Sequence, residues 1–350
     1  MKLTNSPFSI FVILAFLILT PLSLRSEEMM VRCIAFYNLE NLFDIYNDPE
    51  THDDEFTPEG VKQWTQLRYE KKLWNMERVL FDIAAQKKDY PIVIGVSEIE
   101  NRKVLEDLIS QPKLRGGNYR ICHYDSPDAR GVDVAFLYRS DVFKLEGSDN
   151  IKLHVEGLPN FRTRDLVVMW GTIEDEPFYF LVSHWPSRLG GKEASQFKRD
   201  ACAKQIREIK DSLIAQNPAT KVIVMGDLND DATDASIVEV MGAKGKVEEL
   251  QPGDFFNPYN EMLRAGLGTL AYQDEWNLFD NICVTENLVN AEDGKLRIIK
   301  GKRFYGNIFT RPYMLQLEGQ YKNYPLRTFV SNNFQDGYSD HFPVYIYIGK

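Results

Sequence analysis

The sequence has few cysteines, and their spacing is not that of a metal or redox site. The four cysteines, Cys33, Cys122, Cys202 and Cys283, are far apart, lie in apolar segments and form no Cys-x-x-Cys pair. This pattern argues against a structural zinc site and against dithiol redox chemistry. Buried free thiols are the common outcome for cysteines placed in this way, so we predict no disulfide bond.

Long hydrophobic runs are also rare, and the one near the N-terminus is short for a membrane span. The apolar segment 8–22 is followed by the charged stretch 25–28 and has the length of a signal-peptide core. We expect residues 1–26 to be a signal peptide that is cleaved near Ser26, which exports the chain to the periplasm or the extracellular space and leaves no membrane span. An uncleaved N-terminal anchor is the alternative, because Leu24 and Ser26 make an imperfect cleavage site.

Basic residues are fewer than acidic ones. The chain has 41 Lys and Arg against 51 Asp and Glu, a net charge of −10. Removal of the signal peptide takes away Lys2 and Arg25 and no acid, so the net charge becomes −12. An acidic surface repels polyanions at low ionic strength, which argues against tight nonspecific binding to duplex nucleic acid. A local basic groove or a divalent metal ion would still receive a phosphate.

No internal repeat, low-complexity tract or linker interrupts residues 27–350, so we predict one domain there. Short apolar strands alternate with amphipathic helices, and several strands follow each other directly, so the sheet is not wholly parallel. Two sheets packed face to face with outer helices would accommodate a domain of this size. The predicted strands are 31–37, 91–96, 119–124, 132–138, 166–173, 178–183, 221–225, 281–285 and 342–348. Helices are predicted around 73–83, 104–108 and 194–213, with start signals for the first at 57–59, and a long surface loop is predicted at 248–268.

Three oxygen-bearing side chains stand just past apolar runs. Asn38, Glu98 and Asp340 are the hard oxygen donors that magnesium or calcium prefers. Taken singly, each residue has a simpler interpretation, as a turn former, a helix N-terminal acid and a cap. The metal site is therefore a hypothesis about the three residues together.

A second group of polar residues offers hydrolytic chemistry. Asp227 and Asn229 end a strand in Gly-Asp-Leu-Asn, where an acid can position or deprotonate water and an amide can hold an oxyanion. His184 also follows a strand and shares its loop with Arg188, which suits phosphate. These features are what attack on a phosphodiester requires, although an Asx-turn would equally explain Asp227 and a structural histidine would explain His184.

Ser339-Asp340-His341 places a carboxylate and an imidazole in one loop before the last strand. Asp280 precedes another strand and is able to orient His341 by accepting its second ring proton. The loop therefore offers a proton-transfer group beside a metal ligand.

Together these motifs resemble the endonuclease/exonuclease/phosphatase superfamily, the DNase I-like proteins, and among them secreted bacterial nuclease-like members. The resemblance spans residues 31–348, and the motifs occur in the order of that superfamily. The segments that carry it are Phe-Tyr-Asn-Leu-Glu-Asn at 36–41, Gly-Val-Ser-Glu at 95–98, Ser-His-Trp-Pro-Ser at 183–187, Gly-Asp-Leu-Asn at 226–229, Phe-Asp-Asn-Ile at 279–282 and Ser-Asp-His at 339–341.

This resemblance implies an α+β fold, a four-layer α/β/β/α sandwich of two mixed sheets. By motif match, Asn38, Glu98 and Asp340 would surround Mg²⁺, with Mn²⁺ or Ca²⁺ as alternatives. The implied catalytic residues are His184, Asp227, Asn229, Asp280 and His341. Which of Asp227 and His341 is the general base stays open. Arg130, Arg164 and Arg188 are expected to contact substrate, although each would equally suit an ion pair.

The expected function is that of a secreted, metal-dependent phosphoester hydrolase. The first hypothesis is a monomeric phosphodiesterase that cleaves DNA or RNA by in-line attack of an activated water. A phosphatase or a sphingomyelinase-like phospholipid phosphodiesterase on the same scaffold is the second hypothesis, because a fold does not fix a substrate. The third is a non-catalytic binding module.

Overall fold

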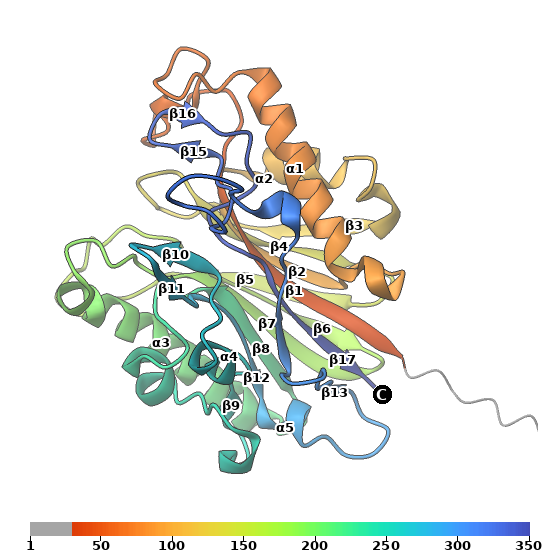
Figure 1. The fold of residues 1–350 in the computed structure, drawn as a ribbon. Coiled ribbons are helices and arrows are strands. Elements are labelled where there is room, and N and C mark those ends of the chain that lie inside the picture. Colours follow the sequence, from red (N-terminus) through yellow and green to blue (C-terminus); the bar gives the residue numbers. More distant parts are fainter. Residues whose placement is uncertain (1–29) are drawn as a thin grey trace, which may run out of the picture.

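A computed structural model describes residues 30–350 of the protein, so the predicted signal peptide at 1–26 lies outside the described residues. Two β-sheets pack face to face, and helices cover their outer sides (Figure 1). This arrangement confirms the predicted four-layer α/β/β/α sandwich. Within residues 30–350, no helix is both long and apolar enough to cross a membrane.

Sheet A follows the order β13-β17-β1-β2-β4-β3, and β14 also pairs with β17. Strands β1 and β2 are parallel, whereas the other pairs are antiparallel, so the sheet is mixed as expected. Its strands are β1 (Val31–Leu42), β2 (Val93–Ile99), β3 (Tyr119–His123), β4 (Asp133–Arg139), β13 (Arg297–Ile298), β14 (Gly306–Ile308) and β17 (Val344–Gly349).

Sheet B follows the order β5-β6-β7-β8-β12-β9, with β7 and β8 parallel and the other pairs antiparallel. Its strands are β5 (Lys144–Ile151), β6 (Leu166–Ile173), β7 (Glu176–His184), β8 (Lys221–Asp227), β9 (Phe255–Phe256) and β12 (Asp280–Thr285). Two hairpins, β10 (Leu270–Tyr272) with β11 (Glu275–Asn277) and β15 (Phe329–Val330) with β16 (Asn333–Phe334), stand apart from both sheets.

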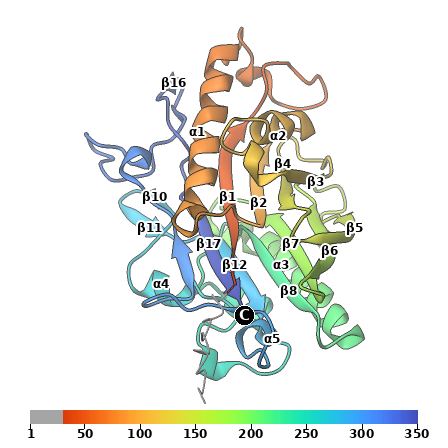
Figure 2. The same ribbon diagram turned by 90° about the vertical axis from the view of Figure 1, so that its right-hand side faces the viewer.

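The helices form the outer layers. Helices α1 (Gln66–Ala84) and α2 (Arg102–Ile109) lie over sheet A, and α3 (Lys192–Gln216) lies on the opposite side, over sheet B (Figures 1 and 2). The short helices α4 (Asn260–Arg264) and α5 (Glu286–Val289) lie in the connections of the C-terminal half. In α1, Leu73, Met76 and Leu80 recur at helical spacing and are buried against sheet A, which is why this segment forms an amphipathic helix.

Alternate residues of β1 belong to different layers of the sandwich. Phe36 packs in the cluster between the two sheets, whereas Tyr37 packs with the helical layer of α1. Gly95 of β2 lies where the sheets approach closely, since a Cβ there would come within 2.5 Å of the Met225 sulfur. The two sheets are therefore in van der Waals contact, and this holds their strand ends in a fixed relation.

Three details can be compared with the sequence analysis. The four cysteines are buried and unpaired, as predicted. The predicted helix start at 57–59 is wrong, because that segment forms a turn in which Gly60 N–H donates to the Thr57 carbonyl, and α1 begins only at Gln66. The predicted surface loop at 248–268 is also wrong in part. It contains β9 and α4, and Phe255, Phe256 and Tyr259 are buried, because their aromatic area is removed from water in the core.

Candidate active site

The predicted catalytic side chains come from strand ends that meet at one edge of the sandwich. His184 and Asp227 end the parallel strands β7 and β8 and lie opposite each other in the ladder. Asp280 begins β12 and lies opposite Asp227 on its other side. Asn38 of β1 and His341, just before β17, come from the facing sheet. The fold therefore brings together residues that are far apart in the chain, such as Asn38 and Ser339, which are 301 residues apart.

Hydrogen bonds join the two sheets at this edge. The Asn38 side-chain amide donates to Oδ2 of Asp227 at 3.1 Å, and both side chains are buried. The Ser339 hydroxyl donates to the Asn38 carbonyl at 2.7 Å and accepts the His341 backbone N–H at 3.1 Å. Buried polar groups that are satisfied in this way form a rigid network. The loop before β17 is thereby fixed against β1 and β8.

Irregular backbone in β1 and β2 positions the Glu98 carboxylate. Glu40, Asn41 and Glu98 have φ values of 47°, 53° and 58°, in the left-handed region that non-glycine residues rarely adopt. The register between β1 and β2 shifts between Asn38 and Leu42, as in a β-bulge. Asn41 N–H donates to the Glu98 carboxylate at 3.1 Å. Bulges often re-aim side chains beside active sites, and here the irregular segment holds the Glu98 side chain in one position.

His341 and Asp280 form a buried pair. The Nδ1 atom of His341 lies 2.7 Å from Oδ2 of Asp280, whose side chain is fully buried. Burial by itself lowers the pKa of His341, but the charges of Asp280 and Asp227 outweigh it and raise this pKa well above its ordinary value. Because Asp280 accepts the Nδ1 proton, Nε2 of His341 faces the site, where it lies 3.7 Å from Asp227.

Asp227 lies between the two histidines. Its Oδ2 atom is 3.6 Å from Nε2 of His184, and its Oδ1 atom accepts the backbone N–H of Asn229 at 3.0 Å. Burial raises the pKa of Asp227 to about 6, although the nearby His341 works in the opposite direction. Burial lowers the pKa of His184 well below its ordinary value, and Arg164 and Arg130 lower it further. The site therefore pairs a neutral imidazole with a carboxylate that titrates close to neutrality.

The carboxylates of Glu98 and Asp340 are each paired with an arginine. Nη2 of Arg130 lies 3.3 Å from Oε1 of Glu98, and Arg327 forms an ion pair with Asp340. Burial by itself lowers the pKa of Arg130, yet Glu98 and Asp340 both contribute to raising it above its ordinary value. The same two carboxylates, with Glu40, raise the pKa of Arg327 against the effect of burial. Since each guanidinium is influenced by both acids, Glu98 and Asp340 belong to one cluster.

The side chains at this edge fit a divalent cation. Asn38, Glu98 and Asp340 offer an amide and two carboxylates, which is an oxygen donor set of the kind that Mg²⁺ and Ca²⁺ bind. Asp227, Asp280 and His341 also present ligand atoms that all lie within 4.8 Å of one another, so they too form a group able to hold a metal ion. The donor chemistry of the site is therefore compatible with a metal-dependent reaction.

Two predicted substrate contacts, Arg164 and Arg188, are engaged within the protein. Arg164 is nearly buried and donates to Asp128 at 3.0 Å and to the Trp185 carbonyl at 2.8 Å. Arg188 donates to the Asn229 carbonyl at 2.8 Å and to Asp234 at 2.7 Å. These arginines brace the loops after β7 and β8, whereas Arg130, which is about half exposed, reaches the Glu98 carboxylate directly.

Three charged residues beside the site were not predicted from the sequence: Glu40, Lys72 and Arg327. Glu40 accepts the Thr328 N–H at 2.7 Å, and burial together with Asp340 raises its pKa to about 7. Lys72 is buried and donates to the Thr328 hydroxyl at 2.6 Å, and burial lowers its pKa to about 8. Lys72 lies on the buried face of α1, so its burial could have been predicted from the helical spacing. Arg327 lies in an irregular segment, where no sequence periodicity indicates which side chains face the site.

A cavity of about 260 Å³ opens beside these carboxylates. Asp340, Asn41 and Glu40 form the part of its wall that adjoins the site, and Arg327 and Lys62 contribute two cations. Phe56 and Phe329, which pack edge to face at 6.3 Å, provide an apolar side. The cavity is therefore a small polar pocket in contact with the acidic cluster.

Comparison with known proteins assigns the chain to a family. The sequence profile of the Endonuclease/Exonuclease/phosphatase family matches residues 33–350. Two solved structures from Bacteroides thetaiotaomicron, an endonuclease/exonuclease/phosphatase family protein and a mannosyl-6-phosphatase, are each 18% identical, with TM-scores of 0.54 and 0.53. The alignments cover 92% and 91% of this chain and 96% and 99% of those chains. D. rerio TDP2 complexed with a single-strand DNA product is 16% identical with a TM-score of 0.52, and the alignment covers 91% of this chain and 99% of that chain. No match was found among curated proteins.

The fold is that of the DNase I-like class of proteins, to which phosphoester hydrolases belong. Two mixed sheets form the sandwich, and paired acids, an Asp–His pair and asparagines stand at one edge. The chain belongs to the Endonuclease/Exonuclease/phosphatase family, as the match over residues 33–350 establishes. The resemblance inferred from the sequence motifs is thereby confirmed. The structural neighbours are below 20% identity, so they support the fold and do not determine the substrate.

Proposed function

We propose that this protein is a divalent-metal-dependent phosphodiesterase that cleaves DNA or RNA by in-line attack of water. The observation that carries the proposal is the buried meeting of Asp227, Asn38, His184 and His341 between the two sheets, beside the acids Glu98 and Asp340. Asn38, Glu98 and Asp340 would hold Mg²⁺, or alternatively Mn²⁺ or Ca²⁺, which when bound polarises a phosphoryl oxygen and stabilises the departing alkoxide.

The proton chemistry is assigned to the residues around Asp227. Its carboxylate, with a pKa raised to about 6 by burial, is ionised at neutral pH and able to orient the attacking water and accept its proton. His341 is held protonated by Asp280, so we assign it to donate a hydrogen bond from Nε2 to a phosphoryl oxygen. We therefore propose Asp227 as the general base, a choice between Asp227 and His341 that the sequence had left open.

The remaining predicted residues hold the substrate or its loops. Asn229 donates from its side chain to the Trp185 carbonyl at 2.9 Å, which leaves one amide proton for an oxyanion. We assign neutral His184 to contact the phosphate or assist the leaving group. Arg130 is the cation best placed to reach a phosphate, because it already contacts Glu98 and remains half exposed. Arg164 and Arg188 are proposed to act on the substrate through the loops that they brace.

Nucleic acid is the first substrate class that we propose. A fold neighbour, D. rerio TDP2, is complexed with a single-strand DNA product, and this supports a phosphodiester substrate on the same scaffold. The net charge of −10 favours single strands or chain ends over tight duplex binding, since an acidic surface repels a dense array of phosphates.

A phosphatase is the second candidate, and the small cavity beside Asp340 favours it. Its volume of about 260 Å³ and its polar wall suit one compact hydroxylated group attached to a phosphate. Another fold neighbour is a mannosyl-6-phosphatase. A phospholipid substrate or a binding module without turnover is less favoured, because the site retains an acid, a base and a set of metal ligands.

We further propose that the protein is exported after cleavage of residues 1–26 and acts as a monomer of one domain, residues 27–350. The apolar segment 8–22 supports export. N-terminal sequencing of the secreted protein and its mass in solution test these points. A mature protein that begins at Met1, or one that forms a stable dimer, would contradict them.

A substrate panel tests the function. Plasmid DNA, RNA, sphingomyelin and mannose 6-phosphate would be incubated with the mature protein and Mg²⁺, or with EDTA. We expect Mg²⁺-dependent cleavage of DNA or RNA. Faster hydrolysis of mannose 6-phosphate would favour the phosphatase, whereas no hydrolysis of any substrate would favour the binding module.

A further inference from the structure

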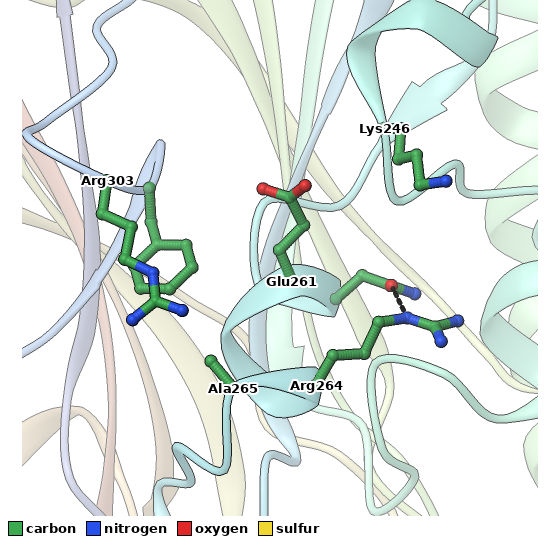
Figure 3. Close-up of a pocket in the computed structure, with 7 residues that line it drawn as sticks. Lys246, Glu261, Arg264, Ala265 and Arg303 are labelled. Carbon is green, nitrogen blue, oxygen red and sulfur yellow. Dashed lines mark hydrogen bonds between the residues drawn. The ribbon is translucent and has the colours of Figure 1, made fainter.

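A second cavity, of about 310 Å³, lies away from the active site. It is lined by α4 and by two segments that approach the helix, and Figure 3 shows its side chains. The charged lining residues are Lys246, Glu261, Arg264 and Arg303, and none of them belongs to the active site. Its volume is at the lower end of the range of small-ligand pockets. In a chain with an excess of acids, a cavity with three cations and one carboxylate is a local reversal of charge.

Arg264 is held in place by a buried side chain. Its Nε–H donates to Oδ1 of Asn260 at 2.9 Å, the bond that is dashed in Figure 3. The Asn260 amide in turn donates to the Ala232 carbonyl at 3.0 Å, and Asn260 is only 6% exposed. A guanidinium fixed through Nε retains its two terminal nitrogens for a ligand, and a planar fork of this kind matches two oxygens of a phosphate. Within residues 30–350, neither Arg264 nor Arg303 forms an ion pair with a carboxylate.

The other charges are arranged around Glu261. Figure 3 shows Lys246 and Arg264 to one side of the Glu261 carboxylate and Arg303 to the other. Arg303 lies over the ring of Phe304 at 4.7 Å, so it has an apolar support but no salt bridge among the described residues. Lys246 makes only an exposed ion pair with Glu249 at 3.6 Å, which is weak in solvent. The cavity therefore presents cations for an anion and one acceptor for hydroxyl groups.

We propose that this cavity is a second ligand site, which binds a phosphorylated sugar such as the ribose phosphate of a nucleotide. The phosphate lies between Arg264 and Lys246, and the sugar hydroxyls donate to the Glu261 carboxylate. Glu261 sets the selectivity, because a bare phosphate gains the cations but also meets the repulsion of this carboxylate, whereas a sugar phosphate offsets that repulsion with hydrogen bonds. This binding requires no metal ion and no hydrolysis, so it is independent of the function proposed above.

Calorimetric titration of the mature protein in EDTA tests this site with three probes: ribose 5-phosphate, inorganic phosphate and ribose. We expect ribose 5-phosphate to bind more tightly than phosphate, and ribose to bind least. Arg264→Gln should weaken the binding of ribose 5-phosphate about tenfold, since it removes a charge-assisted fork. The affinity of Arg264→Lys for ribose 5-phosphate should lie between those of the wild type and of Arg264→Gln, because lysine retains the charge but loses the bond to Asn260.

Two further variants distinguish binding at this site from nonspecific attraction between the anion and positive charges elsewhere on the protein. Glu261→Gln should leave phosphate binding unchanged or tighter while it reduces the preference for ribose 5-phosphate over phosphate. Arg120→Gln, which removes an exposed arginine on β3, is the matched control and should have no effect. The proposal is overturned if Arg264→Gln, folded with an unchanged Tm, binds ribose 5-phosphate as the wild type does, or if the Arg120 and Arg264 variants lose affinity equally.

Discussion

Nδ1 of His341 lies 2.7 Å from Oδ2 of Asp280, a residue that begins β12 of the opposite sheet. This contact joins the loop before β17 in sheet A to sheet B, and it determines which nitrogen of the imidazole faces the site. The contact is present because the two sheets pack closely enough to bring their strand ends together. Because the fold places Asp280 beside His341, the fold itself raises the pKa of this histidine.

Replacement of Asp280 should move the alkaline limit of activity. Asp280 raises the pKa of His341, so the protonated ring that we propose as donor to the phosphate persists to higher pH in the wild type. Activity should fall as the pH rises through the pKa of His341, and in Asp280→Asn this fall should occur at lower pH. The pH profile of kcat/KM checks the shift. Identical alkaline limbs in the two proteins would contradict the role of Asp280 as a positioning residue.

Asp227→Asn should remove both the activity and its acid limb. The Asp227 carboxylate must be ionised to accept a proton, and its pKa is about 6. Wild-type kcat/KM should therefore rise with pH below about 6 and then level off, while the variant should lose about 10²- to 10⁴-fold at neutral pH. Asp211→Asn, at an exposed position of α3, is the control and should behave as wild type. A variant that retained the acid limb would show that another group titrates there.

Removal of the metal should abolish activity and lower stability. A ligand that binds only the folded protein stabilises it, so Tm should rise with Mg²⁺ concentration and fall in EDTA. Glu98→Gln should weaken Mg²⁺ binding about tenfold or more, because it replaces a carboxylate of the donor set with a neutral amide. Thermal melts over a Mg²⁺ series measure this directly. A Tm that does not respond to Mg²⁺ in the wild type would argue against the proposed ligands.

Lys72→Met should destabilise the protein by roughly 3 kcal/mol, since it removes one member of a buried charged network and leaves Glu40 less well compensated. Lys72 donates to the Thr328 hydroxyl, and it is one of the charges that lower the raised pKa of Glu40. Urea denaturation gives the free energy of unfolding. Lys71→Met is the matched control, because Lys71 is partly exposed and pairs with Asp336 at the surface. Equal losses in both variants would contradict a special role for the buried lysine.

The sequence predicted the layers, and it pointed to polar residues that lie together at one edge, for a physical reason. Strands are visible as short apolar runs, and Asn38, Glu98 and Asp227 stand at or just past the ends of such runs, where a sandwich gathers its polar groups. Glu40 and Arg327 were missed because their positions depend on a bulge in β1 and on the irregular chain before β17, which local patterns do not encode. Arg188 was expected to face a substrate, yet it lies among three nearby carboxylates, a contact that only the tertiary fold determines.

The most direct test of the account is the rate of hydrolysis of the best substrate in the panel by the wild type, by His341→Ala and by His154→Ala. His154 is exposed in the connection between β5 and β6, so its variant controls for the loss of a histidine. The account predicts Mg²⁺-dependent hydrolysis by the wild type and the His154 variant, and a loss of at least about 10²-fold in the folded His341 variant. Equal rates in all three proteins, or hydrolysis that persists in EDTA, would contradict it.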